Sequence, residues 1–231
     1  MSVIQLWGDS LSMGVVFDET RGRYIITPNR FAVALEAELG IQVNNHSRMG
    51  AVVTEGYQRF VKSPIKPGGI VVVAYGGNDC DMPWKAVCED PDALRQARTP
   101  LPLFIQTLFD FVKAIRDQGM PPLLVTRPPL DANRYFDWVT RNLSKEVVLR
   151  YLGDVAHIYR WQERYAIAVR NVAQAAKCAL FDARDAFLED MGYLNHLCVD
   201  GIHINEDGHA LITHAIVAQR ENLSESLTML A

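Results

Sequence analysis

Three polar side chains in two distant segments could together carry out acyl transfer. Ser10 lies in the segment Gly-Asp-Ser-Leu-Ser at 8–12, directly after a short apolar run, and Asp200 and His203 are three residues apart near the other end of the chain. A serine hydroxyl is a poor nucleophile until a base takes its proton. A histidine can act as that base when a carboxylate fixes its tautomer and stabilises the imidazolium. We therefore interpret Ser10 as a candidate nucleophile, His203 as its base and Asp200 as the acid that orients His203.

The same chemistry needs hydrogen-bond donors for the oxyanion that forms during the attack. Asn78, in Gly-Gly-Asn-Asp at 76–79, follows a strongly apolar run and can donate from its side-chain amide. Gly50 has no Cβ and can bring its backbone N–H close to a reacting group. With the N–H of Ser10, these groups form a candidate oxyanion hole made of Ser10, Gly50 and Asn78. Each motif alone is an ordinary turn or cap, and only the combination is specific.

Short apolar runs alternate with longer amphipathic segments, which indicates the elements that position these residues. Apolar and β-branched runs predict strands at 3–7, 41–46, 70–74, 123–126 and 178–181. Amphipathic spacing and capping residues predict helices at 27–39 (with Thr27-Pro28 as its start), 52–62, 101–118, 154–177 and 205–220, and then a frayed tail at 221–231. This alternation predicts a parallel sheet between helices, in a single domain over residues 1–231.

The order of the motifs along the chain is typical of a known enzyme family. The chain resembles the SGNH (GDSL) hydrolases, whose four named residues are Ser, Gly, Asn and His. The family's blocks match 8–12, Asn45 through Gly50, 77–79 and Asp200 through His203. The resemblance extends over the whole chain in order, although it does not define the segments between the blocks.

This resemblance implies a flavodoxin-like three-layer α/β/α sandwich with a five-stranded parallel sheet of order 2-1-3-4-5. It also implies a carboxylic ester hydrolase with no metal or organic cofactor, in which Ser10 forms an acyl-enzyme, His203 is base and then acid, and Asp200 orients His203. Two positions depart from the family pattern. Ser47 stands where many members carry another glycine, and Ile204 where many carry proline.

Two segments are longer than the minimal pattern requires, and both leave the carboxyl edge of the sheet, where open α/β sheets bind ligands. They are about residues 79–100 and 127–153. We expect some of their aromatic and cationic side chains to pack together and others to line a pocket: Trp84, Lys85, Arg95, Arg98, Arg134, Tyr135, Phe136, Trp138, Arg141, Arg150 and Tyr151. Such side chains suit a carbohydrate-sized ligand. The expected substrate is therefore a short-chain acyl ester of a carbohydrate or small metabolite, with acetyl as the favoured acyl group.

Two other functions remain open from the sequence. An acyltransferase would use the same three residues and pass the acyl group to an alcohol other than water. A non-catalytic carbohydrate- or metabolite-binding module would keep the fold without the chemistry, although here every catalytic position is filled. The oligomeric state is not indicated.

Composition and charge bear on partners and location. The net charge of −4 provides no basic field for nucleic acid. No segment approaches the ~18–20 apolar residues of a membrane span, and no leader precedes Ser10, so a cytoplasmic protein is expected. The four cysteines lack metal-like spacing and are expected to be buried or incidental thiols. A redox role for Cys80, beside the Asn78 motif, is a disfavoured alternative.

Asp9 and the remaining histidines are secondary candidates. Asp9 is expected to hold the turn rather than to do chemistry. His46 precedes Gly50 and is a weaker candidate for the pocket. His209 is expected to have a surface or capping role on the last helix. His157 and His196 are expected to be structural.

Overall fold

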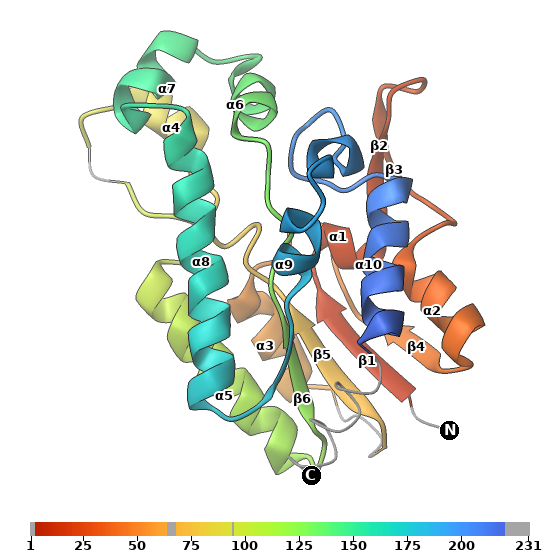
Figure 1. Ribbon diagram of the computed structural model, residues 1–231. Coiled ribbons are helices and arrows are strands. Elements are labelled where there is room, and N and C mark those ends of the chain that lie inside the picture. The colour runs from red at the N-terminus through yellow and green to blue at the C-terminus, as the bar shows by residue number, and fades with distance from the viewer. Residues whose placement is uncertain (1–2, 64–67, 94, 220–231) are drawn as a thin grey trace.

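A computed structural model of the chain describes residues 3–63, 68–93 and 95–219 (Figure 1). Its centre is a sheet of order β4-β1-β5-β6-β7, in which every neighbouring pair runs parallel. The strands are β1 (Val3–Gly8), β4 (Gln42–Asn45), β5 (Ile70–Ala74), β6 (Pro122–Val125) and β7 (Ala179–Phe181). Counted along the chain, these five strands have the order 2-1-3-4-5, so the expected fold class is confirmed.

Strand β5 occupies the centre of the sheet because its sequence has no polar side. Val71 through Ala74 are all buried, and the strand pairs with β1 on one side and β6 on the other. An unbroken apolar run of this kind suits a parallel strand that is covered on both faces.

Helices cover both faces of the sheet (Figure 1). One layer contains α3 (Val53–Val61), α5 (Leu101–Asp117) and α8 (Ala156–Ala175), and the other contains α2 (Phe31–Leu39), α9 (Ala183–Leu188) and α10 (Glu206–Ala218). Helix α5 illustrates the pattern, because Phe104, Leu108, Phe111 and Ile115 recur at helical spacing and are all buried. Each of the predicted strands and helices corresponds to one of these elements, with ends shifted by a few residues. Arg220 and the tail at 221–231 lie outside the described residues.

The two long segments fold into helices above the carboxyl edge of the sheet. The first contains α4 (Trp84–Glu89), and the second contains α6 (Ala132–Thr140) and α7 (Lys145–Leu152) (Figure 1). With the start of α8 they form a separate apolar cluster that includes Leu130, Phe136, Val148 and Ile158. The expectation that part of these segments packs together is therefore confirmed.

The chain between the first strand and the second helix holds a feature that the sequence analysis missed. After the short helix α1 (Ser10–Met13), β2 (Val15–Asp18) and β3 (Arg23–Ile26) form an antiparallel hairpin. The expected helix start at Thr27-Pro28 is wrong, because α2 begins only at Phe31. Thr27 is fully buried, donates a hydrogen bond to the Glu206 carboxylate and accepts one from the Asn29 N–H (3.1 Å). Its capping chemistry therefore ties the end of the hairpin to α10.

His209 also differs from expectation. It lies in the first turn of α10, which comes after a short 3-10 helix, η1 (Tyr193–His196). Its side chain is fully buried and does not lie on the surface. Neither ring nitrogen has a hydrogen-bond partner among the described residues. Burial lowers the pKa of His209 from 6.5 to about 4, because an apolar environment disfavours the charged imidazolium.

This lowered pKa predicts a pH-dependent stability. The unfolded chain binds a proton at this histidine below pH 6.5, whereas the folded chain does so only below about 4. The stabilisation is therefore complete above the unfolded pKa and is lost as the pH falls, by about 3 kcal/mol over that window. We expect His209→Leu to remove this part of the pH dependence in urea unfolding between pH 7 and 4.

The control for this prediction is His214→Leu, on the exposed side of the same helix. It should leave the pH dependence of the wild type unchanged. Parallel stability curves for wild type and His209→Leu across that pH range would contradict the prediction.

Candidate active site

Ser10 is the first residue of α1, directly after the turn at Asp9 that follows β1. Asp9 is the N-cap of α1, and its Oδ1 accepts the Leu11 N–H (3.0 Å). The helix ends after one turn at Gly14, whose φ of 85° is strained for a residue with a Cβ. Asn45, at the end of β4, donates to the carbonyl of Ser12 (2.7 Å) and so holds α1 from the neighbouring strand. These local contacts place the Ser10 side chain at the carboxyl edge of the sheet.

The structure brings Ser10, His203 and Asp200 together in one hydrogen-bonded chain. The Ser10 Oγ lies 2.9 Å from the His203 Nε2, and the His203 Nδ1 lies 2.6 Å from the Asp200 Oδ2. Ser10 and His203 are 8% exposed and Asp200 is fully buried. This is the geometry in which a histidine can take a serine proton while a carboxylate holds its other nitrogen.

Asp200 stays ionised although it is buried. Burial alone opposes its negative charge, but its Oδ2 accepts from His203, and its Oδ1 accepts the backbone N–H groups of Ile202 and His203 at 3.0 Å each. These bonds outweigh desolvation and hold the pKa of Asp200 below its ordinary value. At neutral pH a negative charge therefore faces the imidazole.

The candidate oxyanion donors Asn78 and Gly50 are fixed by a shared partner. The Asn78 Nδ2 donates to the Ala51 carbonyl (3.3 Å), which defines the orientation of the amide. Arg98, from the first long segment, donates to the Asn78 Oδ1 (3.4 Å) and to the Gly50 carbonyl (3.0 Å). Gly50 has a φ of 72° and lies in a turn in which the Ala51 N–H donates a hydrogen bond to the Arg48 carbonyl. Arg98 was expected only to pack or line a pocket, and this link between the two donors was not predicted.

Asp79, next to Asn78, anchors this loop. It is fully buried, its Oδ1 accepts the N–H of Val53 (2.9 Å) and its Oδ2 accepts the N–H of Gly76 (3.0 Å). One carboxylate thus joins the exit of β5 to the first turn of α3. Burial raises the pKa of Asp79 to about 6.

A third buried carboxylate, Asp9, pairs with an arginine at the exit of β6. The Arg127 Nη2 lies 2.7 Å from the Asp9 Oδ1, with the side chains 9% and 1% exposed. The Arg127 Nη1 also donates to the Ala74 carbonyl at the end of β5 (3.4 Å). Asp9 therefore holds the turn, as expected, and it does so through a partner that the sequence analysis did not identify.

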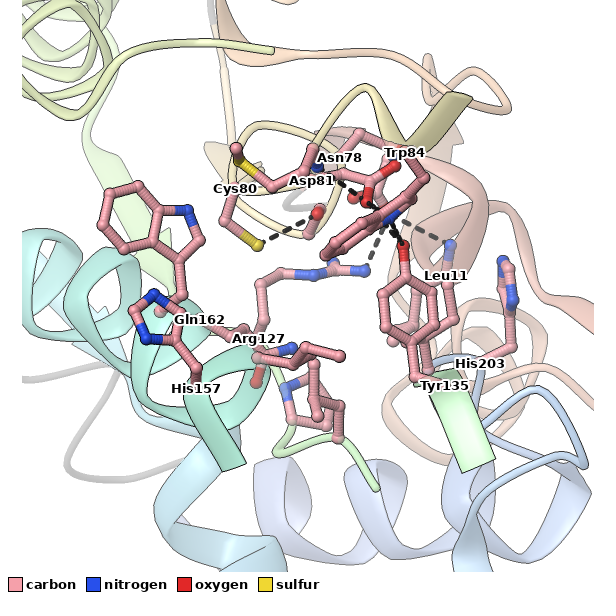
Figure 2. Close-up of a pocket in the computed structure, with 18 of the residues that line it drawn as sticks. Leu11, Asn78, Cys80, Asp81, Trp84, Arg127, Tyr135, His157, Gln162 and His203 are labelled. Carbon is pink, nitrogen blue, oxygen red and sulfur yellow. Dashed lines mark hydrogen bonds and ion pairs between the residues drawn. The ribbon is translucent and has the colours of Figure 1, made fainter. Parts of the chain in front are cut away.

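A cavity of about 160 Å³ opens beside Ser10 and His203. In Figure 2, His203 lies at one end, His157 at the other and Arg127 between them. Besides Arg127, four aromatic and cationic residues of the two long segments line the cavity: Trp84, Arg95, Tyr135 and Tyr151. The Trp84 Nε1 (2.8 Å) and the Tyr135 hydroxyl (2.5 Å) both donate to the Asp81 Oδ1. Asp81 therefore joins the two segments over the site.

Helix α8 supplies the far wall of the cavity. His157 and Trp161 line it, with their rings stacked at a centroid distance of 6.1 Å and an interplanar angle of 17°. The interpretation of His157 as structural is therefore incomplete, because its exposed ring faces the cavity. The sequence held one signal for this placement, because His157 lies one turn from Trp161 on the same face of an amphipathic helix.

The other secondary candidates lie elsewhere. His46 stacks on Trp7 (4.5 Å) and bonds the Gln5 side chain (2.7 Å), so it supports the base of the site instead of facing the cavity. His196 pairs with Asp190 (2.7 Å), as its expected structural role requires. All four cysteines are free thiols. The Cys80 thiol lines the cavity and donates to the Gly77 carbonyl (3.2 Å), and burial raises its pKa far above the ordinary value.

No cluster of three or more His, Cys, Asp or Glu side chains in the described part of the chain could hold a metal ion. Among the same residues, no helix has both the length and the apolar character needed to cross a bilayer.

Comparison with known proteins identifies the family. The model of the GDSL-like lipase/acylhydrolase family matches residues 6–211. The chain belongs to this family. The match includes every residue of the Ser10–His203–Asp200 chain and both loops that carry the candidate oxyanion donors. No match was found among curated protein sequences.

Solved structures of a lipase/acylhydrolase and of two esterases share the fold. A lipase/acylhydrolase from Enterococcus faecalis is 20% identical, with a TM-score of 0.63 over 96% of both chains. A carbohydrate acetylesterase from Sinorhizobium meliloti is 17% identical, with a TM-score of 0.66 over 96% of this chain and 100% of its own. A catalytic mutant of an acetylxylan esterase from Geobacillus stearothermophilus is 18% identical, with a TM-score of 0.63 over 95% of both chains.

The buried Asp9–Arg127 pair predicts a large stability effect. Arg127→Met leaves the Asp9 charge buried without its partner, which should cost about 3–5 kcal/mol of unfolding free energy. Adding Asp9→Asn to this variant should recover much of the loss, because the unpaired charge is then gone. Urea denaturation of the single and double variants measures both effects.

Arg150→Met provides the matched control, since Arg150 pairs with Asp92 at the surface, where the side chains are 61% and 85% exposed. Its unfolding midpoint should stay close to that of the wild type. If Arg127→Met proves no more destabilising than Arg150→Met, the Asp9–Arg127 pair does not hold the turn.

Proposed function

We propose that this GDSL-family protein is a serine ester hydrolase that acts through an acyl-enzyme. Its proposed substrates are short-chain acyl esters, with acetyl favoured, of a carbohydrate or small metabolite. The observation that carries this proposal is the chain of hydrogen bonds from Ser10 through His203 to Asp200 at the mouth of a cavity. A serine held in this way can lose its proton to the imidazole as it attacks a carbonyl carbon.

The proposed reaction has two steps with the same groups. In the first, the Ser10 Oγ bonds to the acyl carbon and its proton passes to the His203 Nε2, which returns it to the leaving alcohol as the ester bond breaks. In the second, a water molecule gives a proton to His203 and attacks the acyl-enzyme, and Ser10 leaves with that proton. The charge of Asp200 stabilises the imidazolium in both steps. The N–H groups of Ser10 and Gly50 and the Asn78 amide are the proposed donors to the oxyanion.

The walls of the cavity support a carbohydrate-sized substrate. Their aromatic rings come from four different helices, with Trp84 on α4, Tyr135 on α6, Tyr151 on α7 and Trp161 on α8. Aromatic faces with polar groups at their edges bind ligands that have both apolar C–H faces and hydroxyls. Two of the structurally similar proteins are an acetylxylan esterase and a carbohydrate acetylesterase, in keeping with this class of substrate.

The first test measures the nucleophile. A fluorophosphonate should label the wild type and leave Ser10→Ala unlabelled, and hydrolysis of 4-nitrophenyl esters should fall from acetate to octanoate. Ser10→Ala and His203→Ala should each lose at least about 10³-fold in kcat, with thermal transitions close to that of the wild type. Full turnover in Ser10→Ala would rule out the mechanism. A folded wild type that neither reacts with the label nor hydrolyses any ester would favour a binding module.

The second test concerns the far wall. Trp161→Leu removes one stacking face, which is worth about 1 kcal/mol and thus roughly a fivefold rise in KM. We expect that rise with an acetylated xylooligosaccharide and a much smaller one with 4-nitrophenyl acetate, which has no sugar ring to stack on Trp161. Steady-state kinetics with both esters provide the comparison, with the small ester as internal control. Equal changes in KM for the two substrates would exclude a sugar-binding role for this wall.

A further inference from the structure

The hairpin brings a tyrosine hydroxyl onto the acid of the proposed triad. Tyr24, on β3, donates a hydrogen bond to the Asp200 Oδ2 (2.8 Å), the same oxygen that accepts from the His203 Nδ1 (2.6 Å). We propose that Tyr24 is a positioning residue that sets the basicity of His203 by sharing the charge of Asp200. The inference rests on the proposed function for its catalytic meaning, but its physical claim about His203 does not.

Packing holds the Tyr24 ring in place. Its centroid lies 5.0 Å from that of His203, and its other neighbours are Phe17 on β2 (5.2 Å) and Trp138 on α6 (6.1 Å). Trp138 also packs edge-on against Phe17 (4.9 Å), and the Arg141 guanidinium lies 4.1 Å above the Trp138 ring. The second long segment therefore clamps the hairpin, which in turn fixes the hydroxyl against Asp200.

The two oxygens of Asp200 have different environments. Oδ1 accepts the backbone N–H groups of Ile202 and His203, whereas Oδ2 is shared by the His203 ring and Tyr24. A donor on Oδ2 stabilises the carboxylate by itself and so weakens the attraction of that oxygen for the imidazolium proton. Removing the Tyr24 hydroxyl should strengthen that attraction and make His203 more basic.

Tyr24 can act only as a neutral donor. Its burial and the adjacent charge of Asp200 raise its pKa far above the ordinary value for tyrosine. The hydroxyl therefore keeps its proton at neutral and acidic pH, and its effect on Asp200 is constant across that range.

Other charged or titratable groups also face this cluster, and all are retained when only the Tyr24 hydroxyl is removed. Ser10 and His209 lie near His203. Cys198 lies near both Tyr24 and Asp200, with Glu19 beside it, and Arg141 lies near Tyr24. A difference between Tyr24→Phe and the wild type therefore isolates the hydroxyl.

The test is an NMR titration of the His203 ring in the full-length protein. Tyr24→Phe keeps the ring and removes the hydroxyl, so we expect the pKa of His203 to rise by about half a unit, a fraction of the strength of a hydrogen bond to a charged group. The acidic limb of the pH profile of kcat/KM should move to higher pH by the same amount. An unchanged or lowered pKa of His203 would overturn the proposal.

Tyr165→Phe is the matched control. It removes a buried tyrosine hydroxyl that donates to the Thr99 carbonyl (2.7 Å), away from Asp200. It should lower stability without shifting the titration of His203, and an equal shift in both variants would overturn the specific role of Tyr24. Incorporation of 3-fluorotyrosine at position 24 strengthens the donor without changing the packing, and it should shift the pKa of His203 downward.

The titration also separates this inference from the proposed function. A raised pKa of His203 in Tyr24→Phe, in a protein that hydrolyses no ester, would uphold the role of Tyr24 and contradict the esterase proposal. Ester hydrolysis, with the same pKa of His203 in the wild type and in Tyr24→Phe, would support the esterase proposal and contradict the role of Tyr24.

Discussion

The arrangement of this site depends on three fully buried carboxylates, since each must find hydrogen-bond donors for a charge that has no access to water. Asp9 uses the Leu11 N–H and the Arg127 guanidinium, so it joins the exits of β1 and β6. Asp79 uses two backbone N–H groups and joins the exit of β5 to α3. Asp200 joins the loop before α10 to the hairpin. Each carboxylate lies within three residues of a side chain proposed to act on the substrate, so the demand for donors fixes the reacting groups.

The same demand gives these carboxylates different electrostatic properties. Asp79 accepts the backbone N–H groups of Val53 and Gly76, and burial raises its pKa to about 6. Asp200 has the His203 ring and the Tyr24 hydroxyl in addition to two backbone N–H groups, and its pKa falls below the ordinary value. Of Asp79 and Asp200, the carboxylate proposed to stabilise an imidazolium is thus the one whose ionised form the protein favours.

The sequence predicted the parallel fold and the proximity of Ser10, Asn78 and His203, because strands of one parallel sheet bring their carboxyl ends to a single edge. It did not predict the partners that hold these residues. Tyr24 reaches Asp200 across 176 residues of chain, and Arg127 reaches Asp9 across 118. Such contacts depend on tertiary packing, which leaves no local periodicity. The error at Thr27-Pro28 has the same origin, because a residue with good capping chemistry was used for a contact with Glu206 instead.

The most direct test of the central claim is to trap the acyl-enzyme. The wild type is mixed with 4-nitrophenyl acetate, quenched in acid within a turnover, digested and mapped by mass spectrometry. The account predicts one acetyl group on the peptide that contains Ser10, and none in Ser10→Ala treated in the same way. An acetyl group on another residue during turnover, or turnover at the wild-type rate in Ser10→Ala, would contradict it.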